Sequence, residues 1–175
     1  MASNFIDNSA EYTERLNRAL EAALEACGTQ CESHVVQILT KDAYKHPVSW
    51  YNRTGALKKF SHQVDMGEKC VFVGTNLKYA PYWEYGTGKY ADGGGRQGYW
   101  VFVPGSENGD RVGSAKVYTE QQAKQIMAIL QSKGVDAHMT DGIQPVHMLK
   151  RAVEDYKDEY QQIFNQYLRT VTGGG

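Results

Sequence analysis

Cys27, Cys31 and His34 are the residues whose types and spacing could bind a metal ion. Steps of four and three residues place the three side chains on one side of a helix, and thiolate and imidazole are ligands that zinc takes in proteins. A tetrahedral site needs a fourth ligand, and the sequence has no second Cys/His pair at zinc-like spacing. Because both cysteines occupy apolar positions, we interpret them as packing thiols and expect no metal site.

The run GTGK at residues 86–89 could contact a phosphate group. A Walker loop ending there would need glycine in place of Trp83, and a Ser or Thr in place of Tyr90 to hold Mg²⁺. A dinucleotide pattern ending at Ala91 matches in letters alone, because proline interrupts the preceding segment and glycines follow where a helix should begin. We therefore expect no nucleotide site and no cofactor.

No motif in the sequence predicts nucleophilic or acid–base catalysis. The sequence has no Gly-x-Ser-x-Gly turn, and no cysteine stands in a recognisable reactive context. The paired carboxylates of Glu154 or Asp155 with Asp158 fall on the polar side of a predicted helix, where contact with water explains them. The expectation is a protein without enzymatic activity.

The composition is that of a soluble globular protein. The 175 residues are 41% hydrophobic and 22% charged, which suits one domain, or one domain with a sizeable insertion. A net charge of -1 argues against a protein whose main task is to grip nucleic acid. An odd number of cysteines, three, argues for a reducing compartment. With no apparent membrane span or signal peptide, the expected location is the cytoplasm.

Two long helices are predicted from hydrophobic spacing, at about residues 11–40 and 147–171. Ser9 is the expected N-cap of the first helix. Gly28 lies inside that helix and suggests a bend or a close helix contact. The apolar and aromatic stripe of the second helix contains Leu149, Ala152, Val153, Tyr156, Tyr160, Ile163, Phe164, Tyr167 and Leu168.

The middle of the chain is predicted to form strands. A turn and a short helix at 54–60 precede a β-hairpin, with strands at 60–66 and 69–74, and a further strand is expected at 99–103. A capping box of Thr119 and Gln122 opens a helix that stops at Gly134, before a short strand at 135–139.

These elements predict one α+β domain over residues 1–175, with long N- and C-terminal helices packed on a small, mainly antiparallel β-sheet. The helix–strand unit lies in an insertion at about 104–143, and residues 172–175 form a flexible tail.

The stretch YAPYWEYGTG at residues 79–88 concentrates aromatic rings around one proline and ends in glycines. We expect a short, irregular element here, because proline removes a backbone donor and glycine removes side-chain constraint. Two interpretations stay open: the rings belong to the core of the domain, or they are presented to another chain.

The order of motifs resembles a family of tailed-phage morphogenesis proteins that join head to tail, the neck, tail-completion or minor tail proteins of the lambda tail protein Z type. The resemblance covers most of the chain. It is carried by TGAL at 54–57, VFVGTN at 71–76, YAPYWEYGTG at 79–88 and Gln144-Pro145 before the last helix. Two features depart from the family. VHML at 146–149 replaces the aromatic that often follows that proline, and the segment 117–141 is longer than in a minimal member.

The resemblance implies a non-enzymatic virion protein that forms a homo-oligomeric ring, with six and twelve subunits as candidates, and is assembled in the cytoplasm of the host bacterium. Its implied partners are connector or head-closure proteins and tail-terminator or tail-tube proteins, with no membrane. The implied interface residues are Tyr79, Pro81, Tyr82, Trp83, Glu84, Tyr85, Gly86 and Gly88. The basic residues that could face genomic DNA in the channel are Lys58, Lys59, Lys89 and Arg96.

Two alternatives remain at this point. A tail terminator or head-closure protein shares the size and the ring habit. In a different class, a small-ligand or nucleic-acid-binding module would use the glycine-rich loop at 89–98.

Overall fold

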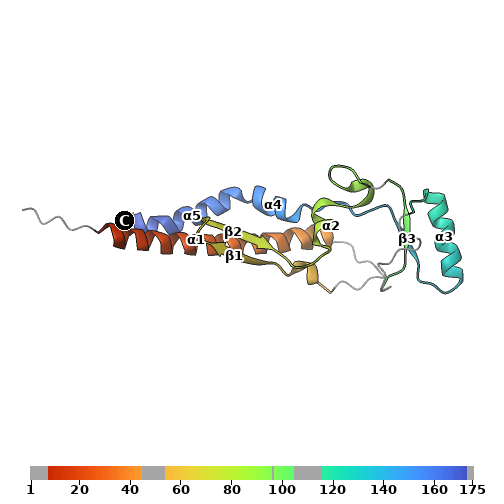
Figure 1. Ribbon diagram of the computed structural model, residues 1–175, viewed down its shortest axis with the longest axis horizontal. Helices are drawn as coiled ribbons and strands as arrows, with labels where there is room; N and C mark the ends of the chain where they lie inside the picture. Colours follow the sequence, from red (N-terminus) through yellow and green to blue (C-terminus); the bar gives the residue numbers. More distant parts are fainter. Residues whose placement is uncertain (1–7, 45–53, 96, 105–115, 173–175) are drawn as a thin grey trace, which may run out of the picture. The chain divides into compact units, whose positions relative to one another are not determined.

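The computed structural model describes residues 8–44, 54–95, 97–104 and 116–172 (Figure 1). The chain forms two compact units. Unit 1 comprises Met1–Lys41, Gly55–Leu77 and Leu149–Gly175, and unit 2 comprises Asp42–Thr54 and Lys78–Met148. The α+β class is confirmed, with the strands in two separate antiparallel pairs. The expected insertion at 104–143 falls within unit 2, and the expected tail lies outside the described residues except for Thr172.

The first helix of unit 1, α1 (Ser9–Ile38), continues into a π-helical turn, η1 (Leu39–Ala43). The predicted N-cap at Ser9 was wrong. Asn8 is the cap residue, because its carbonyl already accepts the amide of Tyr12 at 3.0 Å, as the cap carbonyl of a helix does. Ser9 is therefore the first residue inside the helix, and its carbonyl accepts the hydroxyl of Thr13 at 2.8 Å.

A short 3₁₀ turn, η2 (Ala56–Lys58), precedes the hairpin of β1 (Ser61–Asp65) and β2 (Cys70–Gly74), as predicted. The strands pair antiparallel, with Ser61 opposite Gly74 and Asp65 opposite Cys70. The Asp65 carboxylate accepts the backbone amides of Gly67 and Glu68 at 2.9 and 3.2 Å, which closes the turn.

The hairpin and the last helix pack on different sides of α1 (Figure 1). A hundred degrees of rotation per residue puts Glu25, Gly28 and Glu32 on one side of α1, and these contact His62 of β1. Gln30 and His34 lie on the opposite side and contact α5. A Cβ at Gly28 would lie 2.5 Å from the His62 ring, so the glycine allows a close contact with a strand, and not the helix contact that was predicted.

The prediction of one unbroken C-terminal helix was wrong. The chain forms α4 (Met148–Glu154) and α5 (Lys157–Thr172), with a break at residues 155 and 156. In a continuous helix the carbonyl of Ala152 would accept the amide of Tyr156. Here the hydroxyl of Tyr160 donates to that carbonyl at 2.6 Å, and the Tyr156 ring stacks on His34. A side-chain hydrogen bond from α5 to α4 and a ring contact with α1 thus stabilise the break.

Unit 2 contains the sheet of β3 (Trp100–Phe102) and β4 (His138–Thr140), which pair antiparallel, and the helix α3 (Glu120–Ser132). The predicted capping box is confirmed: Thr119 and Gln122 exchange side-chain to backbone hydrogen bonds at the start of α3. The helix covers a core whose fully buried members are Val101, Ala123 and Ala137. Strand β4 begins three residues later than the strand predicted at 135–139.

Candidate assembly site

The aromatic stretch forms a helix, α2 (Ala80–Tyr85), and not the irregular element predicted from its proline and glycines. Pro81 stands in the first turn, where the missing N–H costs nothing because the first amides of a helix have no partner within it. The helix ends at Gly86, whose φ of 72° is in the region that favours glycine. Proline and glycine therefore set the bounds of this helix.

The helix α2 has an inward and an outward side. Ala80 and Glu84 are buried and Trp83 is half-buried, which is the core interpretation. Tyr79, Tyr82 and Tyr85, spaced by three residues, expose 38%, 51% and 59% of their surface. Pro81 is exposed as well. The core interpretation therefore holds for the inward side of residues 79–88, and the interface interpretation stays a prediction for the outward side.

The glycine end of this aromatic block, residues 79–88, docks on residues 141–146, which precede the last helices. The amide of Thr87 donates to the carbonyl of Ile143 at 2.9 Å, and the amide of Ile143 donates to the Thr87 hydroxyl at 2.9 Å. The amide of Val146 donates to the carbonyl of Trp83 at 2.7 Å. Two motifs that are about 60 residues apart in the sequence therefore form one hydrogen-bonded structure.

This docking leaves no room for side chains at three glycines. A Cβ at Gly86 would lie 2.9 Å from Cδ of Pro145, and one at Gly88 would lie 2.1 Å from the carbonyl oxygen of Asp141. On the facing segment, a Cβ at Gly142 would lie 2.0 Å from the carbonyl oxygen of Thr87. Gly86 and Gly88, expected as interface residues, are buried and serve contact within the chain.

Lys89 forms an ion pair with Asp141 on the same docked segment, and its ammonium lies 4.8 Å from the centre of the Tyr90 ring. A hydrogen bond with Asp141 raises the pKa of Lys89, and the same bond lowers the pKa of Asp141. The charge of Lys89 is thus balanced by a partner in the protein, which is a structural role that the sequence pattern did not indicate.

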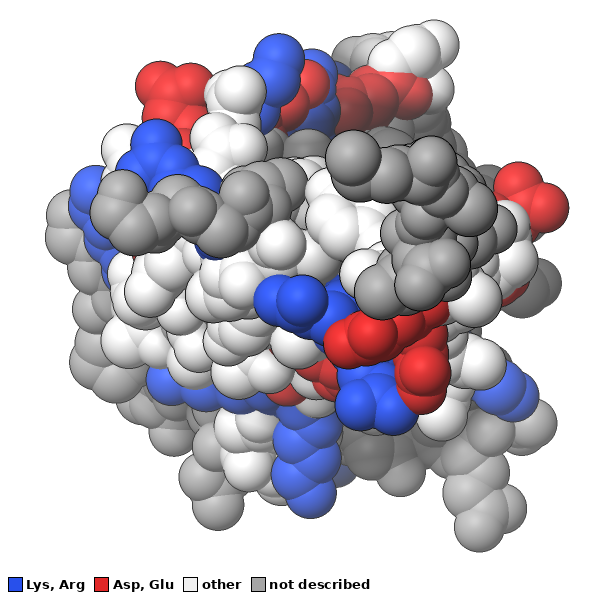
Figure 2. All heavy atoms as spheres, turned by 90° about the vertical axis from the view of Figure 1, so that its left-hand side faces the viewer, with Lys and Arg blue, Asp and Glu red and all other residues white. Residues whose placement is uncertain are grey.

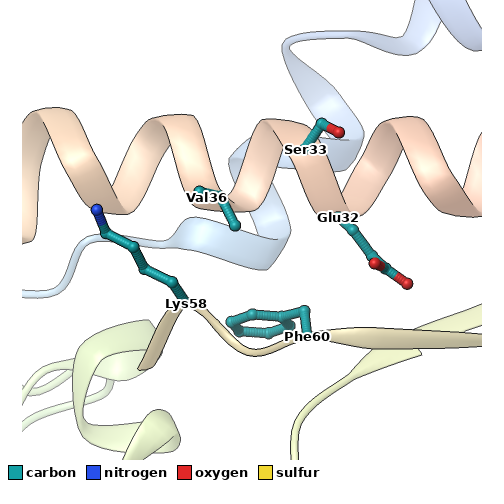
Figure 3. Close-up of a pocket in the computed structure, with 5 residues that line it drawn as sticks. All are labelled: Glu32, Ser33, Val36, Lys58 and Phe60. Atoms are coloured by element: carbon teal, nitrogen blue, oxygen red, sulfur yellow. The ribbon is translucent and has the colours of Figure 1, made fainter. Parts of the chain in front are cut away.

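The basic residues expected at a DNA channel do not all belong to one described unit. Lys58 and Lys59 belong to unit 1 and Lys89 to unit 2, while Arg96 lies outside the described residues. Lys58 borders a groove of about 300 Å³ between α1 and the start of the hairpin, together with Val36 and Phe60 (Figure 3). On the face shown in Figure 2, Lys and Arg side chains are interspersed with Asp and Glu. The described residues of that face therefore form no continuous positive surface.

The three candidate metal ligands occupy the interface of α1 with α5. Cys31 and His34 are buried, and the thiol of Cys27 lies 3.7 Å from the carbonyl oxygen of Tyr160. Burial raises the pKa of both cysteines, which keeps them as thiols. Among the described residues, no three His, Cys, Asp or Glu side chains are arranged to hold a metal ion.

His62 was not singled out from the sequence, yet it links β1 to α1. Its Nδ1 lies 2.5 Å from an oxygen of Glu32, and its Nε2 lies 2.8 Å from an oxygen of Glu25. Both ring nitrogens must carry hydrogen to donate to the two carboxylates, so this geometry requires the imidazolium. The hydrogen bonds to Glu32 and Glu25 raise the pKa of His62.

The free energy of unfolding is therefore expected to fall as pH rises above about 6.5, the ordinary histidine value. The folded state holds the His62 proton more tightly than the unfolded state, so the stabilisation is complete below that pH and is lost as pH passes the raised pKa. Urea denaturation between pH 6 and 8 measures it. His62→Gln should cost about 1–2 kcal/mol at pH 6 and flatten the profile. An unchanged slope would contradict the assignment.

None of the helices in the described parts of the chain is long and apolar enough to cross a membrane. Comparison with known proteins found no matching family model, no matching curated protein and no matching solved structure.

Proposed function

We propose that this chain is a structural virion protein of a tailed bacteriophage, a ring-forming neck component that joins the head connector to the tail. In the proposed ring, the outward tyrosines of α2 contact the neighbouring subunit or the adjoining neck protein. Rings of this kind form when two different surfaces of each subunit meet head to tail. The tyrosine side of α2 is one such surface.

The observation that carries the proposal is the division of the aromatic block into two sides. Its inward side and its glycines are held to residues 141–146 by hydrogen bonds, so α2 is fixed before any partner binds. Tyr79, Tyr82 and Tyr85 are nevertheless exposed. Rigid, exposed tyrosines are typical of interface hot spots, because they bury a large area with little loss of side-chain entropy.

The test is the mass of the purified protein, alone and mixed with phage connector or tail-tube complexes, by light scattering after size exclusion. A ring-sized species, or a monomer that joins a large complex, is expected. A monomer that ignores both partners would contradict the neck role.

Replacing Tyr82 and Tyr85 with serine should weaken assembly at least about tenfold, since hot-spot side chains contribute more than about 1 kcal/mol each. Phe72→Ser is the matched control, because Phe72 is 61% exposed but lies on β2, outside the block. Equal assembly of the double variant and wild type would remove α2 from the interface.

A tail-terminator or head-closure role is distinguished in the same experiment by which complex captures the protein. The ligand-binding alternative gains little from the start of the loop at 89–98, because Lys89 is paired with Asp141, and Gly86 and Gly88 just before it pack on backbone carbonyls. A monomer with saturable binding of a small ligand or an oligonucleotide would favour that alternative.

A further inference from the structure

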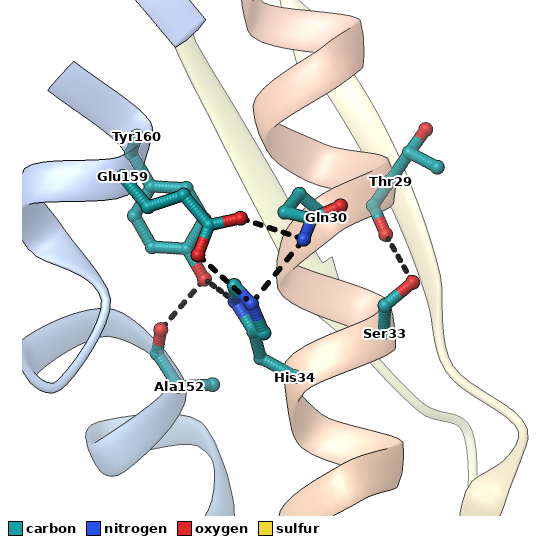
Figure 4. A network of polar contacts seen from close by, with 7 residues as sticks. All are labelled: Thr29, Gln30, Ser33, His34, Ala152, Glu159 and Tyr160. Atoms are coloured by element: carbon teal, nitrogen blue, oxygen red, sulfur yellow. Dashed lines mark hydrogen bonds and ion pairs between the residues drawn. The ribbon is translucent and has the colours of Figure 1, made fainter. Parts of the chain in front are cut away.

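His34 is a buried histidine at the centre of a polar network between α1 and α5 (Figure 4). Its Nδ1 lies 2.9 Å from the Tyr160 hydroxyl oxygen. Its Nε2 lies 3.3 Å from the side-chain nitrogen of Gln30 and 3.3 Å from an oxygen of Glu159. The imidazole also stacks on the Tyr156 ring, with centres 3.5 Å apart and planes 12° from parallel.

The hydrogen bonds determine which nitrogen of His34 carries the proton. Tyr160 has one hydroxyl hydrogen, and it donates this hydrogen to the carbonyl of Ala152 at 2.6 Å. The Tyr160 oxygen can therefore only accept from His34, so Nδ1 must be the protonated nitrogen. In the neutral ring Nε2 is then an acceptor, and the Gln30 amide donates to it.

A second proton would bind at Nε2 of His34. This nitrogen would then lose its hydrogen bond with Gln30 and gain one with Glu159. The Gln30 amide could no longer donate to that nitrogen, although it would keep its 2.7 Å bond to the other oxygen of Glu159. The new N–H would point toward the Glu159 carboxylate, and the charged ring would lie on the face of Tyr156. These gains are set against the cost of a charge on a side chain that is only 3% exposed.

We propose that His34 is a proton-sensitive switch in the pairing of α1 with α5, neutral when the helices are fully paired and weakening that pairing when Nε2 is protonated. The titratable groups that face it are Glu159 and Tyr160 on α5 and Tyr156 between α4 and α5, and Cys31 on α1 interacts in turn with Tyr160. Burial raises the pKa of Cys31 and of Tyr160, so both remain neutral while His34 titrates.

The sign of the effect follows from burial. Desolvation lowers the pKa of His34, against the smaller opposite influence of Glu159. The unfolded chain therefore binds this proton more readily than the folded chain, and stability is lost as pH falls below about 6.5. His62 has the opposite effect, because its stabilisation is lost as pH rises above that value. Together the two histidines give the free energy of unfolding a maximum between the two pH ranges in which they act.

The test is NMR of the full chain labelled with ¹⁵N-histidine, followed from pH 8 to pH 5 together with hydrogen exchange of the α5 amides. The expected result is a proton on Nδ1 of His34 at pH 8, protonation of Nε2 at a lower pH than His62, and faster α5 exchange in the same step. An Nε2–H tautomer at pH 8 would overturn the proposal, and so would α5 exchange that ignores the step.

Glu159→Gln provides a second measurement on a partly exposed residue. Removal of the carboxylate should lower the proton affinity of His34 by about tenfold, the low end for a nearby opposite charge. Glu154→Gln is the control, because Glu154 is exposed on α4 and is not among the partners of His34 given above. An equal change in the proton affinity of His34 in the two variants would show a general effect of charge, and would overturn the specific pairing of His34 with Glu159.

Discussion

Replacing Gly88 with alanine is expected to lower the free energy of unfolding of unit 2 by roughly 3 kcal/mol. The new Cβ would lie 2.1 Å from the carbonyl oxygen of Asp141, and the backbone is held at a φ of 63°. Relief requires the docked segments to separate, which breaks the hydrogen bonds between Thr87 and Ile143. Urea denaturation followed by tryptophan fluorescence measures it, since Trp83 and Trp100 report on unit 2.

Gly93→Ala is the matched control for this prediction. Gly93 has a φ of 75°, close to that of Gly88, but no described atom lies within 4 Å of the position that a Cβ would occupy there. It should therefore cost only the conformational penalty of about 1–2 kcal/mol. A similar loss in the two variants would mean that the close approach of Gly88 to Asp141 is not needed. Gly142→Ala, with a Cβ 2.0 Å from the Thr87 carbonyl oxygen, should behave like Gly88→Ala.

Tyr160→Phe is expected to destabilise unit 1 by about 2 kcal/mol while keeping the aromatic ring in place. The lost hydroxyl donates to the carbonyl of Ala152 and accepts from Nδ1 of His34, so one removal leaves two polar groups in a largely buried place without their partner. Thermal unfolding followed by far-ultraviolet circular dichroism measures it, because α1 and α5 are the long helices of this unit.

Tyr167→Phe controls for the general effect of removing a tyrosine hydroxyl from α5. Tyr167 lies about two turns beyond Tyr160 on the same helix and is not among the partners of His34 given above. Its replacement should change stability by less than about 0.5 kcal/mol. A Tyr160→Phe variant that is no less stable than this control would show that water replaces the hydroxyl at no cost.

Local signals determined several elements of this protein. The capping box at Thr119 is a contact over three residues, and the turn at Asp65 is closed by its own carboxylate. The hydrophobic period likewise predicted α1 to within a few residues. Each signal acts between neighbours in the chain, so it can be read without knowing what packs against it.

Prediction from local patterns failed for the aromatic block at residues 79–88. Its residue types are compatible with a core element and with an interface, and its proline and glycines suggested irregular structure. The structure uses both residues to begin and end a short helix, with Trp83 turned inward and Tyr82 and Tyr85 outward. Which side of α2 is covered depends on the docking of residues 141–146, which no local pattern describes.

The sequence by itself determined the α+β class, the hairpin, the capped helix and the positions of the chemistry-bearing residues. Tertiary structure alone decided their partners: Tyr160 for His34, 126 residues away, Glu25 and Glu32 for His62, and Asp141 for Lys89. The physical reason is the distance along the chain over which each interaction acts. Capping and periodicity are local properties of the backbone, whereas the protonation and hydrogen bonding of a side chain depend on whichever distant segment packs against it.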